Sequence, residues 1–222
     1  MNFYIDFDST LYNTSGLVEK MLRALAAEMS NQDSSLDAEE MYLEEKGMFN
    51  SKNIYNIFEL CRYFAKKYNL DADSLILAVN GVISNGKDLV YEDSAEFLKQ
   101  LKAMGHRINM LTYTAQDGLE YQMQKIYGSG LIQLFDNIII TSTPKWQLDL
   151  NYSQGVFVDD NPKDLAGLHG NNPIAVIRIK REGNKYASKP MPDDIQIPEV
   201  ESLLEVCQKF NLEASIVVQE QN

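Results

Sequence analysis

The sequence FYIDFDST, residues 3–10, decides how the fold of this chain is interpreted. Phe3 to Phe7 form a short apolar run that ends in acids and small polar residues, which is typical of a buried strand whose carboxyl end carries chemistry. Asp6 follows three apolar residues, and burying its charge without a partner would be costly. The stretch therefore predicts a strand with a functional carboxylate at its end.

A region of helical character follows this strand and covers residues 16–86. Apolar side chains recur there at helical spacing, as at Met21, Leu22 and Leu25, and almost nothing in the region has the pattern of a strand. One of its helices is expected to begin at Asp37, with Ser35 or Asp37 as its N-cap. We therefore expect an all-helical insertion directly after the first strand.

Strands and helices alternate through the rest of the chain. The expected strands cover residues 108–111, 137–141, 155–158 and 174–179. The expected helices cover residues 94–104, 116–127, 162–168 and 200–210, with a short one after Pro144. Such alternation implies parallel crossovers and therefore an open α/β sheet.

The chain divides into three parts on this pattern. Residues 1–15 and 87–212 are expected to form an α/β core, residues 16–86 a helical cap, and residues 213–222 a loosely held C-terminal tail. Within the core, residues 181–194 are polar and contain two prolines, so we expect a surface loop there.

The composition excludes several classes of protein and of site. The chain has 20 Lys and Arg against 32 Asp and Glu, a formal net charge of −12, which argues against a nucleic-acid or membrane-surface binder. His106 and His169 are too few for a histidine-rich metal site. Cys61 and Cys207 lack the spacing of a zinc site or a disulfide framework, so we expect buried free thiols in a reducing compartment. With no signal peptide or membrane-length apolar run, we expect a cytoplasmic protein, monomeric or dimeric.

Polar residues follow each of the first four expected strands, at the sheet edge where ligands bind in open parallel sheets. They are Asp6 and Asp8 after the first strand, Thr112 after the second, Lys145 after the third, and Asp159, Asp160 and Asp164 after the fourth. A close group of carboxylates cannot stay ionised without a counter-charge, and Mg²⁺ is the natural partner of such oxygen ligands. Together with a lysine, Mg²⁺ suits a phosphoryl group, whose oxygens both cations neutralise during transfer.

Four segments, in this order, resemble the four motifs of the haloacid dehalogenase-like (HAD) hydrolase superfamily. They are DFDSTL at residues 6–11, Thr112, Lys145, and VDD at residues 158–160 with Asp164. The resemblance spans roughly residues 3–170. It implies a Rossmann-like, doubly wound parallel sheet with a helical cap domain inserted after the first strand.

The resemblance also implies catalytic roles. Asp6 would be the nucleophile that forms an aspartyl phosphate, and Asp8 would protonate the leaving alcohol and then deprotonate the attacking water. Thr112 and Lys145 would hold the phosphoryl oxygens, with Tyr113 as a further candidate for substrate binding. Ser9 departs mildly from the family, because relatives often have Gly or Asn at this position.

The same resemblance implies an Mg²⁺ site. The Asp6 carboxylate, the Asp8 backbone carbonyl and Asp160 would bind the ion. Asp164 lies one helical turn beyond and would support or complete the metal shell, as would Asp159.

Several functions share this inventory of residues. A receiver-like signalling module also has acids, a Thr and a Lys, but in another order and without a helical insertion. Within the superfamily, Asp8 favours phosphate ester chemistry, since dehalogenases and phosphonate hydrolases lack an acid at that position. We therefore expect a phosphatase acting on a small phosphoester, with a phosphomutase as the alternative from the same family.

The substrate stays open at this level. Sugar phosphates, phosphoglycolate-like acids and nucleoside monophosphates all fit the motifs. In the helical cap, Lys52 or Arg62 could bind a second anionic group, and Tyr55 could stack or donate a hydroxyl. The other interpretation of the segment from Phe49 to Tyr55 is ordinary packing of a loop and a helix.

Overall fold

A computed structural model describes residues 1–52, 57–115, 118–150, 155–171, 175–192 and 195–209, except the side chains of residues 49–52, 170 and 171. It confirms the predicted α/β class, with a six-stranded parallel sheet in the order β3-β2-β1-β4-β5-β6. The strands are β1 (Asn2–Ile5), β2 (Arg107–Tyr113), β3 (Asn137–Thr141), β4 (Gly155–Asp159), β5 (Ala175–Ile179) and β6 (Glu199–Val200).

The first strand lies in the middle of the sheet. Ile5 at its end pairs with Met110 of β2 on one side and with Val158 of β4 on the other. Because all the strands run in parallel, the residues that follow their carboxyl ends meet at one edge.

The short strand β6 was not predicted. Val200 was expected to begin the closing helix, but it pairs with Ile179, and the helix covers residues 203–209 within the described part. A strand of two residues is too short to show the alternation that would identify it.

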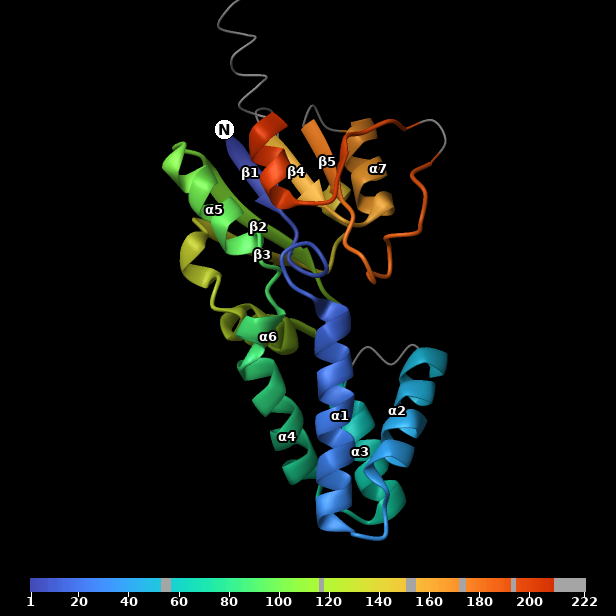
Figure 1. The fold of residues 1–222 in the computed structure, drawn as a ribbon. Coiled ribbons are helices and arrows are strands. Elements are labelled where there is room, and N and C mark those ends of the chain that lie inside the picture. The colour runs from blue at the N-terminus through green and yellow to red at the C-terminus, as the bar shows by residue number, and fades with distance from the viewer. Residues whose placement is uncertain (53–56, 116–117, 151–154, 172–174, 193–194, 210–222) are drawn as a thin grey trace, which may run out of the picture.

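Four helices follow the first strand and lie together at one end of the molecule, away from the sheet (Figure 1). They are α1 (Thr14–Gln32), α2 (Ala38–Lys52), α3 (Ile57–Tyr68) and α4 (Ala72–Ser84), followed by the 3₁₀ turn η1 (Gly86–Leu89). Asp37 caps α2, because its carboxylate accepts hydrogen bonds from the amides of Glu39 and Glu40. The division of the chain into a cap and a core stays a prediction.

The remaining elements are α5 (Ser94–Ala103), α6 (Leu119–Ser129), α7 (Pro162–Asn171) and the 3₁₀ turns η3 (Ile132–Leu134) and η4 (Lys145–Gln147). The short helix expected after Pro144 is therefore a single 3₁₀ turn. The helix expected to end at residue 127 continues through Gly128 to Ser129 as α6. Gly130, with a φ of 71°, is its left-handed C-cap.

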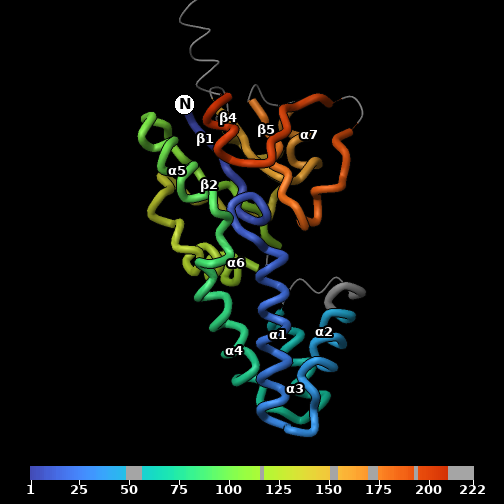
Figure 2. Tube along the Cα trace, in the orientation of Figure 1, coloured from blue at the N-terminus to red at the C-terminus, as the bar shows by residue number. Residues whose placement is uncertain are grey.

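The strands are apolar on both faces, as expected of a parallel sheet covered on two sides. Phe3 and Ile5 of β1 pack into a large core that includes side chains of α1, α5 and α6. Tyr4 points to the opposite face, where Leu165 and Leu168 of α7 cover it. The tube in Figure 2 shows how the chain passes from the sheet into α1 and returns from α4 to α5. Both cysteines are buried and free, as predicted.

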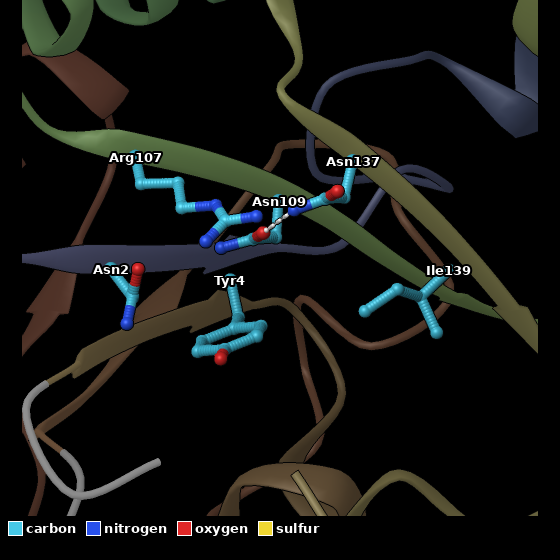
Figure 3. Close-up of a pocket in the computed structure, with 6 residues that line it drawn as sticks. All are labelled: Asn2, Tyr4, Arg107, Asn109, Asn137 and Ile139. Carbon is cyan, nitrogen blue, oxygen red and sulfur yellow. Dashed lines mark hydrogen bonds between the residues drawn. The ribbon is translucent and has the colours of Figure 1, made fainter. Parts of the chain in front are cut away.

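One part of the second face carries polar residues around a hollow of about 350 Å³. Figure 3 shows the residues that line it, with a 2.7 Å hydrogen bond from Asn137 Nδ2 to Asn109 Oδ1. Asn2 and Arg107, which also line it, begin β1 and β2, so the hollow lies away from the edge that carries the predicted site. No helix in the described part of the chain is long and apolar enough to cross a membrane.

Candidate active site

The carboxyl ends of β1 and β4 bring three buried carboxylates together. Asp6, Asp159 and Asp160 each offer an oxygen that lies within 4.8 Å of the other two. The amide of Asp6 donates to the carbonyl of Val158 (2.9 Å), so the pairing of β1 with β4 continues one residue past the strand and places Asp6 beside the acid pair. The sequence predicted this meeting of the two motifs.

Lys145 lies in the middle of these acids and is only 2% exposed. Its Nζ donates to Asp6 Oδ1 at 2.5 Å and to Asp159 Oδ2 at 2.7 Å. The turn η4 carries it to this place directly after β3. Burial acts to lower the pKa of Lys145, but Asp159 and Asp6 more than offset this and raise it, so the side chain is a permanent ammonium group.

The acids carry more negative charge than this lysine balances. Burial, opposed by Lys145 but reinforced by Asp159 and Asp160, raises the pKa of Asp6 well above its usual range. Burial and the neighbouring Asp159 likewise raise the pKa of Asp160 to about 8. The three carboxylates of Asp6, Asp159 and Asp160 are therefore the group best able to hold a hard divalent cation, and their oxygen-only chemistry suits Mg²⁺.

Asp164 is buried near the acids but is not one of the three that share the cluster. Its Oδ2 accepts a 2.7 Å hydrogen bond from Asn161 Nδ2 at the start of α7. Burial and the charge of Asp159 raise its pKa to about 6. Its predicted part in the metal shell stays a prediction.

Asp8 is held by side chains from two helices. Its Oδ1 accepts from Thr14 (2.7 Å) and from Lys125 Nζ (2.6 Å), and its Oδ2 accepts from Gln122 Nε2 (2.7 Å). Burial acts to raise the pKa of Asp8, but the Lys125 charge and these hydrogen bonds together lower it. Gln122 Nε2 also donates to Thr112 Oγ1 (3.0 Å), which ties the second predicted motif to the first.

Lys125 and Gln122 were missed in the sequence. Both lie on α6 and are buried, although helices rarely bury a lysine without a partner. Their spacing of three residues places them on one face of the helix, which is a signal that could have been noticed.

Two residues of the predicted surface loop are buried and contact the motifs. The Arg181 guanidinium donates to the Thr10 carbonyl and pairs with Asp93, while Asn184 Nδ2 donates to Asp160 Oδ2 at 2.5 Å. The prediction of a simple surface loop over residues 181–194 was therefore wrong for these two positions. Polarity alone could not separate an exposed side chain from one that satisfies buried backbone and carboxylate groups.

Ser9 has a left-handed backbone, with a φ of 61°. This region favours Gly and Asn over other residues, which accounts for the Gly or Asn expected at this position in the resemblance.

The structure describes only some of the other predicted substrate contacts. Tyr113 is 50% exposed and follows Thr112 in a strand, so the two side chains point to opposite faces. Arg62 on α3 is exposed. The side chains of the segment from Phe49 to Tyr55, including Lys52 and Tyr55, lie outside the described residues.

Solved structures share this fold. A HAD phosphatase from Thermococcus onnurineus is 18% identical with a TM-score of 0.62, over 94% of this chain and 97% of its own. A provisionally assigned β-phosphoglucomutase from Thermotoga maritima is 15% identical with a TM-score of 0.63, over 94% and 99%. A provisionally assigned HAD hydrolase from Bacillus subtilis, solved bound to magnesium, is 15% identical with a TM-score of 0.59, over 95% and 98%.

The sequence itself matches a family. No curated protein sequence matches the chain. The model of the haloacid dehalogenase-like hydrolases matches residues 2–172, which include all four motifs and the helices between the first two. Since this match covers most of the chain and its site has the acids and the lysine that the motifs imply, the protein belongs to the haloacid dehalogenase-like hydrolases.

Proposed function

We propose that this hydrolase is an Mg²⁺-dependent phosphatase that acts on a small phosphate monoester. The observation that carries the proposal is the buried contact between Asp6 and Lys145 next to Asp160, with Asp8 held two residues further along. With Mg²⁺ bound, the Asp6 carboxylate would be ionised despite its raised pKa, and beside a fixed ammonium group it suits attack on a phosphorus atom whose oxygens need charge neutralisation.

The proposed reaction has two steps. First, an oxygen of Asp6 attacks phosphorus, the bond to the ester oxygen breaks, and the protonated form of Asp8, which is the minor form because the Asp8 pKa is lowered, gives that oxygen a proton. Then Asp8 takes a proton from water, the water oxygen attacks the aspartyl phosphate, and phosphate leaves with Asp6 restored. Lys145 and the hydroxyl of Thr112 bind the phosphoryl oxygens through both steps.

Mg²⁺ would be held by the Asp6 and Asp160 carboxylates and the Asp8 backbone carbonyl, with Asp159 and Asp164 supporting them. When bound, it would supply positive charge to the phosphoryl oxygens. The three-carboxylate cluster supports this assignment, as does the magnesium in the Bacillus subtilis relative. The signalling-module alternative is disfavoured because the family consists of hydrolases.

The test is a phosphate-release screen over metabolite phosphoesters, with and without Mg²⁺. We expect Mg²⁺-dependent release that Asp6→Asn abolishes while the fold is retained, because the amide lacks the nucleophilic charge. The matched control is Asp73→Asn, which makes the same change at an exposed position on α4. More than a trace of activity in Asp6→Asn would rule out the covalent mechanism. Transfer of phosphate between hydroxyls of one substrate, without release, would favour a phosphomutase.

A further inference from the structure

Lys125 and Gln122 are two buried polar side chains on α6 that the proposed reaction does not use directly. They are 3% and 2% exposed, respectively, and one helical turn apart. Burying an ammonium group is costly unless it is paired, so a lysine at this position calls for a reason beyond packing.

The contacts of these two residues converge on Asp8. Lys125 binds one carboxylate oxygen of Asp8 and Gln122 binds the other, at 2.6 and 2.7 Å. Within the described part of the chain, Lys125 is the one ion-pair partner of Asp8. A carboxylate with a donor on each oxygen has little freedom to rotate about its side-chain bonds, so α6 determines where its oxygens point.

Gln122 extends this arrangement to the phosphoryl-binding side. Its amide nitrogen donates to Thr112 Oγ1 at 3.0 Å as well as to Asp8. The same amide therefore sets the distance between the proposed proton donor and a proposed phosphoryl ligand. The Thr112 oxygen accepts this bond, which leaves its own proton free to point toward a phosphoryl oxygen.

The Lys125 side chain is only 4% exposed, whereas that of Asp8 is 27% exposed. Lys125 thus lies behind Asp8, and Asp8 presents the surface that a substrate could reach. Because Lys125 is more deeply buried than Asp8, it is poorly placed to contact the substrate directly. Supporting residues of this kind hold a catalytic group within the narrow range of positions that catalysis requires.

We propose that Lys125 and Gln122 are positioning residues that orient the Asp8 carboxylate for proton transfer to the leaving group. The inference rests on the proposed function, because it needs Asp8 to be the acid and base. Losing the orientation slows steps that depend on proton transfer and spares the binding of the phosphoryl group.

The test compares p-nitrophenyl phosphate, whose leaving group needs little protonation, with phenyl phosphate, whose leaving group needs more. In Lys125→Met we expect kcat/KM, which reports formation of the aspartyl phosphate, to fall by roughly 10- to 100-fold on phenyl phosphate, the scale of a misplaced catalytic group, and to fall less on p-nitrophenyl phosphate. Lys125→Arg, which keeps the cation, should recover part of the loss. Lys87→Met is the matched control, since Lys87 is an exposed lysine beside the end of α6.

A double-mutant cycle with Asp8→Asn separates positioning from any other role. If Lys125 acts through Asp8, Lys125→Met should cause no further loss in the Asp8→Asn protein. An unchanged kcat/KM in Lys125→Met, equal losses of kcat/KM on both substrates, or an additive loss in the double variant overturns the inference. If Lys125→Met does not fold, Gln122→Leu is held to the same three outcomes.

Failure of the proposed function would be seen in the activities of the wild-type protein and of Asp8→Asn. It would appear as a wild-type protein that hydrolyses neither ester, or as an Asp8→Asn variant as active as the wild type. Failure of the inference alone leaves both of those measurements as expected and changes only the Lys125 and Gln122 results.

Discussion

Lys145 is the residue on which the electrostatics of the site depend. It contacts Asp6 and Asp159 at once, and it is buried together with them. Pairs of this kind contribute little when both partners are present, because desolvation offsets the attraction. Removing one partner is expensive, since it leaves a buried charge without compensation.

Replacing Lys145 by Met should therefore affect stability as well as turnover. We expect the free energy of unfolding at neutral pH to fall by about 3–5 kcal/mol, and phosphate release to be lost. Urea unfolding in the presence of a chelator measures the first effect. Lys99→Met on α5 makes the same change at an exposed position and should leave both quantities unchanged. A Lys145→Met protein as stable as that control would show that the acids are neutralised by other means.

At the scale of elements, two connections join the helices α1–α4 to the sheet, and they run side by side. The Asn13 amide donates to the Leu89 carbonyl (2.7 Å), and the Tyr91 amide donates to the Leu11 carbonyl (3.1 Å). Between them, the Tyr12 ring packs against Gly86. A Cβ atom at position 86 would lie 2.1 Å from the Tyr12 hydroxyl, so this contact requires glycine.

Gly86→Ala should lower the free energy of unfolding by about 1–3 kcal/mol, the usual cost of an overpacked core. The Tyr12 hydroxyl is buried and finds no hydrogen-bond partner in the described part of the chain. Tyr12→Phe alone should therefore be nearly neutral, and adding it to Gly86→Ala should recover part of the loss. Thermal unfolding of the two single variants and the double variant measures this coupling. Purely additive effects would contradict the steric explanation.

Glu45 of α2 is a second feature at this scale. Its side chain is buried, and neither carboxylate oxygen has a hydrogen-bond partner within the described residues. Burial, with a smaller effect from Glu44, raises the pKa of Glu45 to about 9. The folded protein therefore holds a proton on Glu45 at pH values where the unfolded chain, with a pKa near 4.5, does not.

The sign of the resulting pH dependence follows from this difference. At pH values between the unfolded and folded pKa of Glu45, the folded state binds one proton more than the unfolded state. The contribution of Glu45 therefore lowers the free energy of unfolding by about 1.4 kcal/mol for each pH unit that the pH rises. Glu45→Gln cannot ionise and should be less sensitive to pH than the wild type between pH 5.5 and 8.5 in urea unfolding. Glu59→Gln, at an exposed position of α3, is the control and should keep the wild-type slope. Parallel pH profiles for wild type and Glu45→Gln would show that Glu45 is ionised when folded.

At the scale of the whole molecule, the acid cluster brings together residues from two distant parts of the chain. Asp6 directly follows β1, and Asp159 and Asp160 lie at the end of β4, about 150 residues later in the sequence. A cation that binds all of them binds the folded state and not the unfolded chain, so it must stabilise the fold as a whole.

Mg²⁺ should therefore raise the unfolding temperature of the protein. At a free concentration about 100 times the Kd the gain is about 2.7 kcal/mol. In a protein of this size that corresponds to a shift of roughly 5–10 °C. Calorimetry with a chelator and then with Mg²⁺ measures the shift, and Asp160→Asn should remove most of it. An equal shift in Asp160→Asn would place the metal elsewhere on the acidic surface.

Much of the fold and most of the acidic site could be predicted from the sequence, because both depend on local patterns. The apolar run before Asp6 and the runs before Thr112 and Asp159 identify buried strands, and parallel strands must present their carboxyl ends at one edge. The helical spacing of apolar residues between the first two motifs likewise predicted the helices α1–α4. The short strand β6 was not predicted, because two residues are too few to show the alternation of apolar and polar side chains that identifies a strand.

Only the tertiary structure decided what surrounds the motif residues. Lys125 lies 117 positions from Asp8, and Arg181 lies 171 positions from Thr10, so no local pattern relates them. Which face of α6 turns toward β1, and how far the loop after β5 folds back, depend on packing summed over the whole core. The sequence by itself determined which residues could do the chemistry, since strand ends and residue types are local properties. Their orientation was decided by the tertiary structure, because side chains from distant elements supply the hydrogen bonds and charges that hold them.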